Sequence, residues 1–219
     1  MSWAQANDRE TVENLQMNRE IKILILVALL WILLRIIEYY LMPFFILPLT
    51  WLGFSIVFLI IAINQIIKLI RERKNLEKTR IMKTLFYVFI FYLTLNRWSV
   101  ENVIEKVDWH ILYKKRMEIV EKVQKKELNP NVSWNNWICE LPFEYPIVSN
   151  GGNDIGISRN DSTQTITVKF FVFRNFFSAP STFFIYTNDK KNIEYYNSIT
   201  ENSKHNWKIK ENWYRIMKE

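Results

Sequence analysis

Residues 21–70 read IKILILVALLWILLRIIEYYLMPFFILPLTWLGFSIVFLIIAINQIIKLI, and this stretch decides the fold. Its charged residues are Lys22, Arg35, Glu38 and Lys68. A helix on the surface of a water-soluble protein needs a polar face, which this stretch lacks. A helix that crosses a bilayer needs about 20 largely apolar residues. Pro43 and Pro48 therefore divide the stretch into two predicted spans, at about 21–41 and 49–70.

A third apolar run, TLFYVFIFYLTLN, covers residues 84–96 and is shorter than the first two. It reaches spanning length over 81–98 if Lys83 and Arg97 extend toward the headgroups and Trp98 lies at the far interface. The run has no polar face, which argues against a helix lying flat on the membrane. We therefore predict a third span, while a two-span arrangement with a buried or interfacial third helix stays open.

The loop between the second and third runs is strongly basic. Seven basic residues stand there against only Glu72 and Glu77, and these seven are Lys68, Arg71, Arg73, Lys74, Lys78, Arg80 and Lys83. The positive-inside rule predicts that this loop is cytoplasmic and contacts anionic lipid headgroups. With three spans, the N-terminal segment 1–20 is cytoplasmic and the C-terminal domain is extracytoplasmic. With two spans, the C-terminal domain is cytoplasmic. The polar segment 1–20 argues against a cleaved signal peptide.

Residues 99–130 carry apolar side chains at helical spacing and predict a juxtamembrane helix. Ser99 is a candidate N-cap and Pro130 a candidate stop. The helix is expected to place its charged face in solvent. A homo-oligomer formed through this helix stays open, because the apolar spacing holds for too few heptads to establish a coiled coil.

Residues 131–219 change to the period of two that is typical of strands. The alternation predicts strands at 154–158, 163–173, 182–187 and 137–141, with one or two more near the C-terminus. The predicted fold class is an α+β membrane protein with N-terminal transmembrane helices over 21–98, the juxtamembrane helix, and a small antiparallel β-sheet domain of four to six strands over 131–219.

Composition excludes several classes of chemistry. Only 4 glycines occur in 219 residues, and they form neither a Walker loop nor a dinucleotide-binding turn. One cysteine, Cys139, and two distant histidines, His110 and His205, make a metal centre improbable. The net charge of +7 belongs mainly to the membrane half, so we expect no nucleic-acid partner. Catalytic motifs are absent, and we expect a protein that is not an enzyme and has no cofactor.

Two sets of residues are candidates for function. Arg35 and Glu38 lie three residues apart in the first span, and ionisable residues within a span suggest an ion path; an interfacial ion pair is the simpler interpretation. Arg174, Phe176 and Phe177 lie in the aromatic stretch KFFVFRNFFSAPSTFFIY and are candidates for binding a protein or peptide.

The sequence therefore predicts a bacterial, multi-pass integral membrane protein in the cell membrane, with the lipid bilayer as its first partner. The most concrete hypothesis is a non-enzymatic, immunity-type protein with an extracytoplasmic recognition domain. Two alternatives stay open: a two-span membrane effector with a cytoplasmic sensor domain, and a small transporter or channel subunit that uses Arg35 and Glu38.

Overall fold

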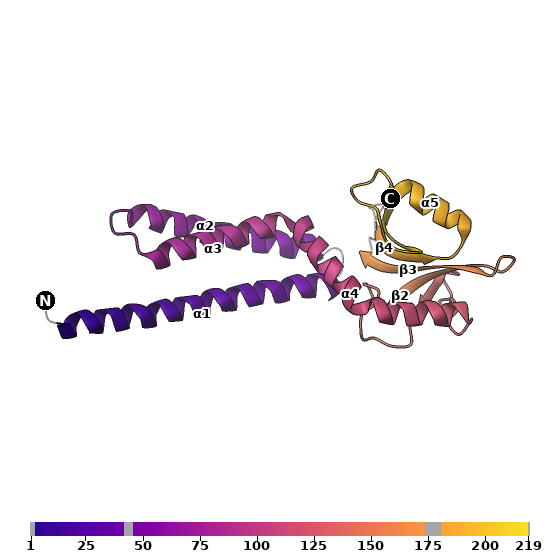
Figure 1. Cartoon of the computed structure of the whole chain (residues 1–219), viewed down its shortest axis with the longest axis horizontal. Helices are drawn as coiled ribbons and strands as arrows, with labels where there is room; N and C mark the ends of the chain where they lie inside the picture. Colours follow the sequence, from indigo (N-terminus) through magenta and orange to yellow (C-terminus); the bar gives the residue numbers. More distant parts are fainter. Residues whose placement is uncertain (1–2, 42–45, 174–180, 219) are drawn as a thin grey trace. The chain divides into compact units, whose positions relative to one another are not determined.

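The structure is a computed structural model that describes residues 3–41, 46–173 and 181–218, with the backbone alone for residues 3–16 and 47. The chain divides into two compact units (Figure 1). One unit comprises residues 1–38 and 45–102, and we call it the helical unit. The other comprises residues 39–44 and 103–219, and we call it the α/β unit.

The helical unit is built from three helices and the start of a fourth. Helix α1 runs Trp3–Leu41, α2 runs Ile46–Arg71, and α3 runs Lys78–Leu95. Helix α1 is continuous through the polar N-terminal segment and is therefore longer than the predicted first span. Pro48 lies in the first turn of α2, where the missing N–H of proline costs nothing because that group has no partner within the helix.

The three helices pack around a small aromatic and aliphatic cluster made by Trp31, Phe58 and Ile90. Helix α3 lies alongside α1 over more than ten residues. At one end Lys83 forms an ion pair with Glu20 at 2.6 Å. At the other end the Trp31 indole donates to the Thr94 hydroxyl at 3.0 Å. The third apolar run is therefore part of the same helical layer as the first.

Helix α4, Arg97–Gln124, follows α3 after a single non-helical residue, Asn96, whose φ is −86° and ψ is 55°. Ser99 is not its N-cap, because the helix has already begun; the Ser99 hydroxyl donates to the Asn96 side chain instead. The helix ends at Gln124, before Pro130, through a left-handed residue, Lys126, with φ of 61°. Backbone bonds from residues 126 and 127 back to residues 123 and 122 complete a Schellman motif.

The α/β unit contains one six-stranded antiparallel sheet in the order β1-β2-β3-β4-β6-β5. Its strands are β1 (Ile138–Glu140), β2 (Asp154–Asn160), β3 (Thr165–Phe173), β4 (Ser181–Thr187), β5 (Trp207–Lys210) and β6 (Trp213–Lys218). The described chain is thus α+β, with five helices and an antiparallel sheet, as the change of periodicity predicted.

Each face of the sheet is covered by a helix. One face packs on α4 through Ile119, Val120 and Val123. The opposite face of β4 and β6 packs on α5, Lys190–Thr200, chiefly through Tyr196. The sequence analysis did not predict α5. Its signal was present, because Asp189 caps the helix by accepting from the Asn192 N–H at 3.0 Å.

In its first half, helix α4 buries a different face from the one that its apolar spacing suggests. Glu105, Asp108 and Arg116 are buried, whereas Val107 and Ile111 are 52% and 71% exposed. The expectation that the charged face is solvated is therefore wrong for these three side chains. The reason is that each has a partner of opposite charge on the domain side of the helix.

Candidate functional site

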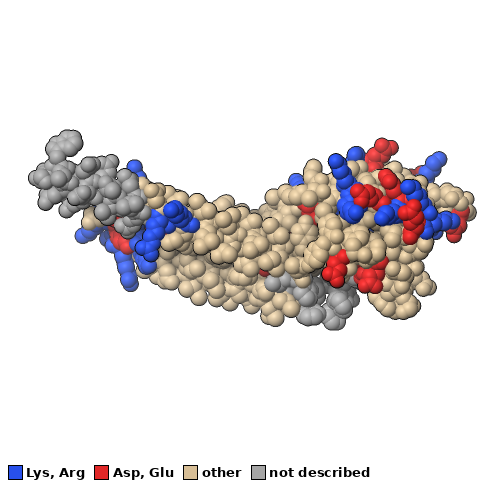
Figure 2. Space-filling model, turned by 90° about the horizontal axis from the view of Figure 1, so that it is seen from below, with Lys and Arg blue, Asp and Glu red and all other residues tan. Residues whose placement is uncertain are grey.

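The outer surface of the helical unit is almost entirely apolar. Leu26, Leu29 and Leu33 of α1 are more than half exposed, as are Leu52 and Ile60 of α2. In Figure 2 this surface is almost entirely tan along the helices, and Lys and Arg gather at one end of the helical unit. Exposed apolar surfaces of this extent mark an interaction site with a membrane or another protein.

Beside the Trp31, Phe58 and Ile90 cluster, the interior of the helical unit also holds small and polar side chains. Ala62, Ser55, Thr84 and Thr94 are buried between the helices. The Thr94 hydroxyl also donates to the Ile90 carbonyl at 2.8 Å, and the Thr94 carbonyl accepts from the Trp51 indole at 2.9 Å. Small residues and inter-helix hydrogen bonds are typical of helices that pack within a bilayer.

By length and composition, one described helix, Pro48–Arg71, is long and apolar enough to cross a membrane. Only 17% of the residues in its most apolar stretch are buried inside the protein. A core helix of a soluble domain would bury most of that surface.

Arg35 and Glu38 form an ion pair at 2.5 Å in which each side chain is only 5% exposed. The Thr50 hydroxyl of α2 donates to the second carboxylate oxygen at 3.4 Å. The guanidinium also lies 5.5 Å from the centre of the Trp31 ring. The two charges therefore neutralise each other within one helix turn.

The predicted headgroup-contacting residues fall into two groups. Five of them, Lys68, Arg71, Arg73, Lys74 and Lys78, are exposed at the α2–α3 connection. The other two are engaged in ion pairs: Arg80 with Glu72 at 2.7 Å, and Lys83 with Glu20 at 2.6 Å. The Lys83–Glu20 pair joins the start of α3 to α1.

The α/β unit carries an aromatic patch on the sheet face opposite α4, and we call it the outer patch. It comprises Trp137, Lys169, Phe171 and Phe183, of which Trp137 is exposed, Lys169 and Phe183 are half-buried and Phe171 is buried. The Trp137 and Phe171 ring centres are 6.3 Å apart, and those of Phe171 and Phe183 are 4.9 Å apart. The Lys169 ammonium lies 5.6 Å from the Trp137 ring centre. Burial lowers the pKa of Lys169, because desolvation disfavours the charged form.

Trp137 can lie flat on the sheet because residue 156 is glycine. A Cβ at Gly156 would come within 2.3 Å of the Trp137 ring, which real structures do not tolerate. The indole remains 41% exposed in this position. The absence of a side chain at Gly156 therefore leaves room for the Trp137 ring to pack on the sheet.

The predicted partner-binding residues, Arg174, Phe176 and Phe177, lie outside the described residues. Strand β3 ends at Phe173 and β4 begins at Ser181, so these residues belong to the connection between the two strands. In the sheet Phe171 of β3 is paired with Phe183 of β4, and both residues belong to the outer patch.

A buried polar cluster holds the end of α1 to α4, and we call it the Asp108 cluster. The Asp108 carboxylate pairs with Arg116 at 2.6 Å and accepts from the Tyr40 hydroxyl at 2.5 Å and from Tyr39 at 3.4 Å. Arg116 also donates to the Val148 carbonyl at 3.0 Å. Each charged group is only 2% exposed, and the hydrogen bonds offset the cost of their burial.

A second buried pair joins α4 to β6, near the β5 edge of the sheet. Arg215 on β6 donates through its Nε to Glu105 at 2.8 Å and through its Nη2 to the other oxygen at 3.2 Å. Its guanidinium lies 4.6 Å from the centre of the Trp207 ring. Sequence reasoning missed both buried clusters, because their partners lie far apart along the chain.

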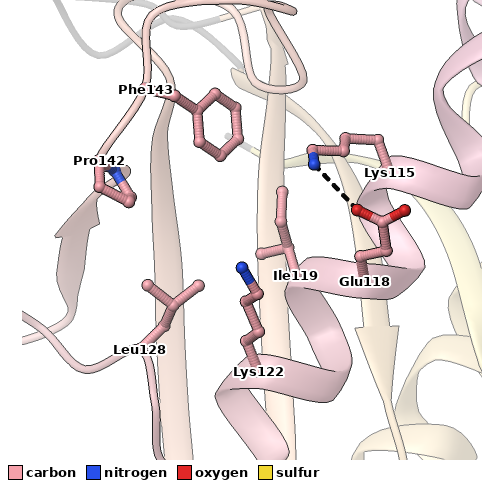
Figure 3. Close-up of a pocket in the computed structure, with 7 residues that line it drawn as sticks. All are labelled: Lys115, Glu118, Ile119, Lys122, Leu128, Pro142 and Phe143. Atoms are coloured by element: carbon pink, nitrogen blue, oxygen red, sulfur yellow. Dashed lines mark hydrogen bonds and ion pairs between the residues drawn. The ribbon is translucent and has the colours of Figure 1, made fainter.

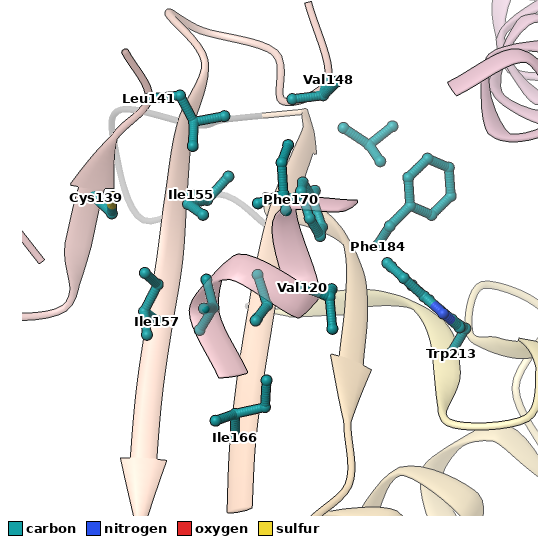
Figure 4. Packing of buried hydrophobic residues seen from close by; sticks show 14 of the residues in the cluster. Val120, Cys139, Leu141, Val148, Ile155, Ile157, Ile166, Phe170, Phe184 and Trp213 are labelled. Atoms are coloured by element: carbon teal, nitrogen blue, oxygen red, sulfur yellow. The ribbon is translucent and has the colours of Figure 1, made fainter. Parts of the chain in front are cut away.

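Two pockets border α4 and the strands it covers. The first, lined by Lys115, Ile119, Leu128 and Phe143 among others, has a cavity volume of about 20 Å³, enough for one water molecule (Figure 3). The apolar core beneath α4 is filled by Val120, Ile155, Phe170 and Trp213 (Figure 4). The second pocket is open and polar and is lined by Lys126, Asn129 and Arg159, among others.

Residues with metal-binding or nucleophilic chemistry do not converge in the described part of the chain. No group of three His, Cys, Asp or Glu side chains there could hold a metal ion. Cys139 is buried on β1, and burial raises the pKa of its thiol. Asp108 and His110 point to different sides of α4, since Asp108 is buried and His110 is exposed.

Comparison of the chain with protein-family models, curated proteins and solved structures finds no match. The inference of function therefore rests on the surfaces and contacts described above.

Proposed function

We propose that the chain is a multi-pass integral membrane protein whose α/β unit is an extracytoplasmic recognition domain of the immunity type, without enzymatic activity. The observation that carries the membrane assignment is the inverted distribution in the helical unit. Most of its large aliphatic side chains face outward, while threonine, serine, alanine and an ion pair are buried beside the Trp31, Phe58 and Ile90 cluster. In water this arrangement would expose a cohesive apolar surface, whereas in a bilayer that surface meets lipid chains.

The packing of α3 supports three spans rather than two. Lys83–Glu20 and Thr94–Trp31 align α3 with α1, and the intervening face of α3 exposes Leu85 and Phe89. A third helix that stayed in the cytoplasm would expose these side chains to water. Beside α1 and α2 it can share their lipid environment.

The charge distribution supports the orientation. The basic α2–α3 connection and the Glu20 region of α1 belong to one end of the helical unit. The positive-inside rule assigns that end to the cytoplasm. Because α3 leads away from it into α4, three spans carry the α/β unit to the opposite side.

The outer patch supports a recognition role. An exposed tryptophan is among the side chains that contribute most to binding at protein interfaces, and Trp137 is 41% exposed. The connection that contains Arg174, Phe176 and Phe177 starts from the same strands.

The first experiment is a topology test. Alkaline phosphatase or a fluorescent protein is fused to the C-terminus, with control fusions after Lys74. Active phosphatase at the C-terminus and inactive phosphatase after Lys74 are expected. Fluorescence without phosphatase activity at the C-terminus would contradict the proposal and favour the two-span effector with a cytoplasmic sensor domain.

The recognition role is tested by photo-crosslinking in intact cells. A benzophenone amino acid at position 137 should give a discrete crosslinked partner, which Phe176→Ser with Phe177→Ser should remove without unfolding the domain. The matched control is the same amino acid at Tyr195, which is 51% exposed on α5. Equal crosslinking at both positions, or crosslinking unaffected by the double substitution, would contradict the binding face.

A further inference from the structure

One surface of the α/β unit has no role in the proposed function. Helix α4 turns one side to the sheet and leaves the other uncovered. On the uncovered side Val103, Val107 and Ile111 are spaced four residues apart, and they are 62%, 52% and 71% exposed. Residues four apart on a helix are neighbours, so the three side chains form one continuous aliphatic row.

Basic side chains flank this row. Lys106, His110 and Lys114 are the other exposed residues of α4 between positions 103 and 114, and none of the exposed side chains in that range is acidic. The acidic residues of the range, Glu105 and Asp108, are buried against the domain, where Arg215 and Arg116 neutralise them. The uncovered side therefore carries an aliphatic row with a basic row along one edge of it.

We propose that this row, which we call the α4 stripe, contacts the headgroup layer of a bilayer that contains anionic lipid. Aliphatic side chains enter the boundary between headgroups and acyl chains, and the long lysine side chains extend to the phosphates. The inference rests on the membrane assignment proposed above and adds a second, peripheral contact to it.

Continuity of the chain favours a lipid partner. Helix α4 begins after Asn96, one residue beyond α3, and the stripe starts only seven residues later at Val103. At 1.5 Å per residue the stripe starts about 9 Å along α4 from its first residue. The non-helical backbone of Asn96 separates the two helices.

Charge and area argue against a second copy of the chain as the occupant. In a symmetric dimer the lysines of one stripe would face those of the other, and like charges repel. A stable interface also needs roughly 20–30 residues a side. The stripe offers three aliphatic side chains, which suits a shallow contact with lipid.

The test uses the full-length protein reconstituted into vesicles of phosphatidylcholine with phosphatidylglycerol. A nitroxide is attached at Val107→Cys, and its depth is measured from collisions with oxygen and with a water-soluble nickel complex. Brief labelling is directed to the introduced thiol because Cys139 is buried. Two control sites are labelled in the same way: Leu59→Cys on the exterior of α2, and Tyr195→Cys on α5.

A deep label at residue 59, a shallow label at 107 and an aqueous label at 195 support the proposal. A deep label at 59 with residue 107 as accessible to nickel as 195 would overturn the stripe and leave the membrane assignment intact. An aqueous label at 59 would overturn the membrane assignment, and the stripe with it.

The lipid charge is tested by Lys106→Glu with Lys114→Glu. Each basic residue near an anionic surface contributes roughly 1 kcal/mol, so even neutralising both should lower the docked-to-undocked ratio roughly thirty-fold, and reversing them should lower it further. The matched control, Lys190→Glu with Lys191→Glu on α5, should leave the label at 107 shallow. A shallow label that persists in the Lys106 and Lys114 variant, or in phosphatidylcholine alone, would overturn the anionic-lipid contact.

Discussion

Removing the Asp108 carboxylate should destabilise the α/β unit strongly. Asp108 and Arg116 are each 2% exposed, and Asp108→Ala would leave the guanidinium buried without its counter-charge. Two carbonyl acceptors would remain, at Val148 and at residue 108 itself. Leaving one charge of a buried pair unpaired typically costs about 3–5 kcal/mol. The Tyr40 hydroxyl would also lose its acceptor, which places the expected loss toward the upper part of that range.

The double variant Asp108→Leu with Arg116→Met separates charge burial from packing. Replacing both charges by apolar side chains removes the unpaired ion, so the double variant should be more stable than Asp108→Ala. The double-mutant cycle is completed with the single variants Asp108→Leu and Arg116→Met. The sum of the losses in unfolding free energy of the two single variants should exceed the loss of the double variant by up to about 3 kcal/mol. This difference is the coupling free energy of the pair.

The assay is urea unfolding in detergent micelles, followed by near-ultraviolet circular dichroism. Trp109 and Trp213, whose ring centres are 4.9 Å apart in the core, should provide a signal for the α/β unit. The matched control is Lys115→Ala on the same helix, which removes an exposed pair with Glu118 and should cost less than about 1 kcal/mol. A loss below 1 kcal/mol for Asp108→Ala, or strictly additive losses in the cycle, would refute the reasoning.

Four further predictions follow from single groups. Arg35→Ala should lower the amount of folded protein in membranes, because it leaves the Glu38 carboxylate buried without its counter-charge. The double variant Arg35→Ala with Glu38→Ala should recover much of that amount. An immunoblot that shows no recovery would argue against a neutralising pair. Hydrogen bonds from the Asn192 backbone and from Thr165 lower the pKa of Asp189. The stabilising effect of its carboxylate is therefore present above the ordinary pKa of 3.8 and is lost as the pH falls through the lowered value. Asp189→Ala should flatten the acid side of a plot of Tm against pH, and an unchanged slope would contradict this. Burial lowers the pKa of Lys169, so the unfolded chain binds more protons and the stability of the folded protein should rise as the pH climbs toward 10.5. Lys169→Met should raise the Tm at pH 7 and abolish that rise. A lower Tm would mean that the contact of the Lys169 ammonium with the Trp137 ring outweighs the cost of desolvation. Cys139 should react with a maleimide only in urea, because it is buried and its thiol pKa is raised; rapid labelling of the folded protein, detected by mass spectrometry, would show that β1 opens.

The helices and strands were largely predictable because their signals are local. The apolar runs at 21–41 and 49–70 correspond to described parts of α1 and α2, and the alternation at 163–173 corresponds to β3. Helix α5 was missed because its pattern is short, although the Asp189 cap was visible. The α4 boundaries were displaced because the Schellman motif at Lys126 ends the helix before Pro130.

The candidate sites were less predictable because they depend on residues that are distant in sequence. Arg35 and Glu38 were recognised, since a spacing of three on one helix brings their side chains together. Trp137 was assigned only to a strand, because its position on the sheet depends on the missing Cβ at Gly156.

The sequence by itself determined that this chain has long apolar helices next to a strand-rich domain, because hydrophobicity and periodicity are properties of contiguous residues. Only the tertiary structure decided which side of α4 is buried. Judged from spacing, Val103, Val107 and Ile111 form the natural core face, yet they are exposed, and the charged Asp108 lies in the core. The reason is that burial of a charge depends on its partners. The carboxylate of Asp108 meets Arg116 two turns along the helix and Tyr40 from 68 residues away, and no local pattern contains that meeting.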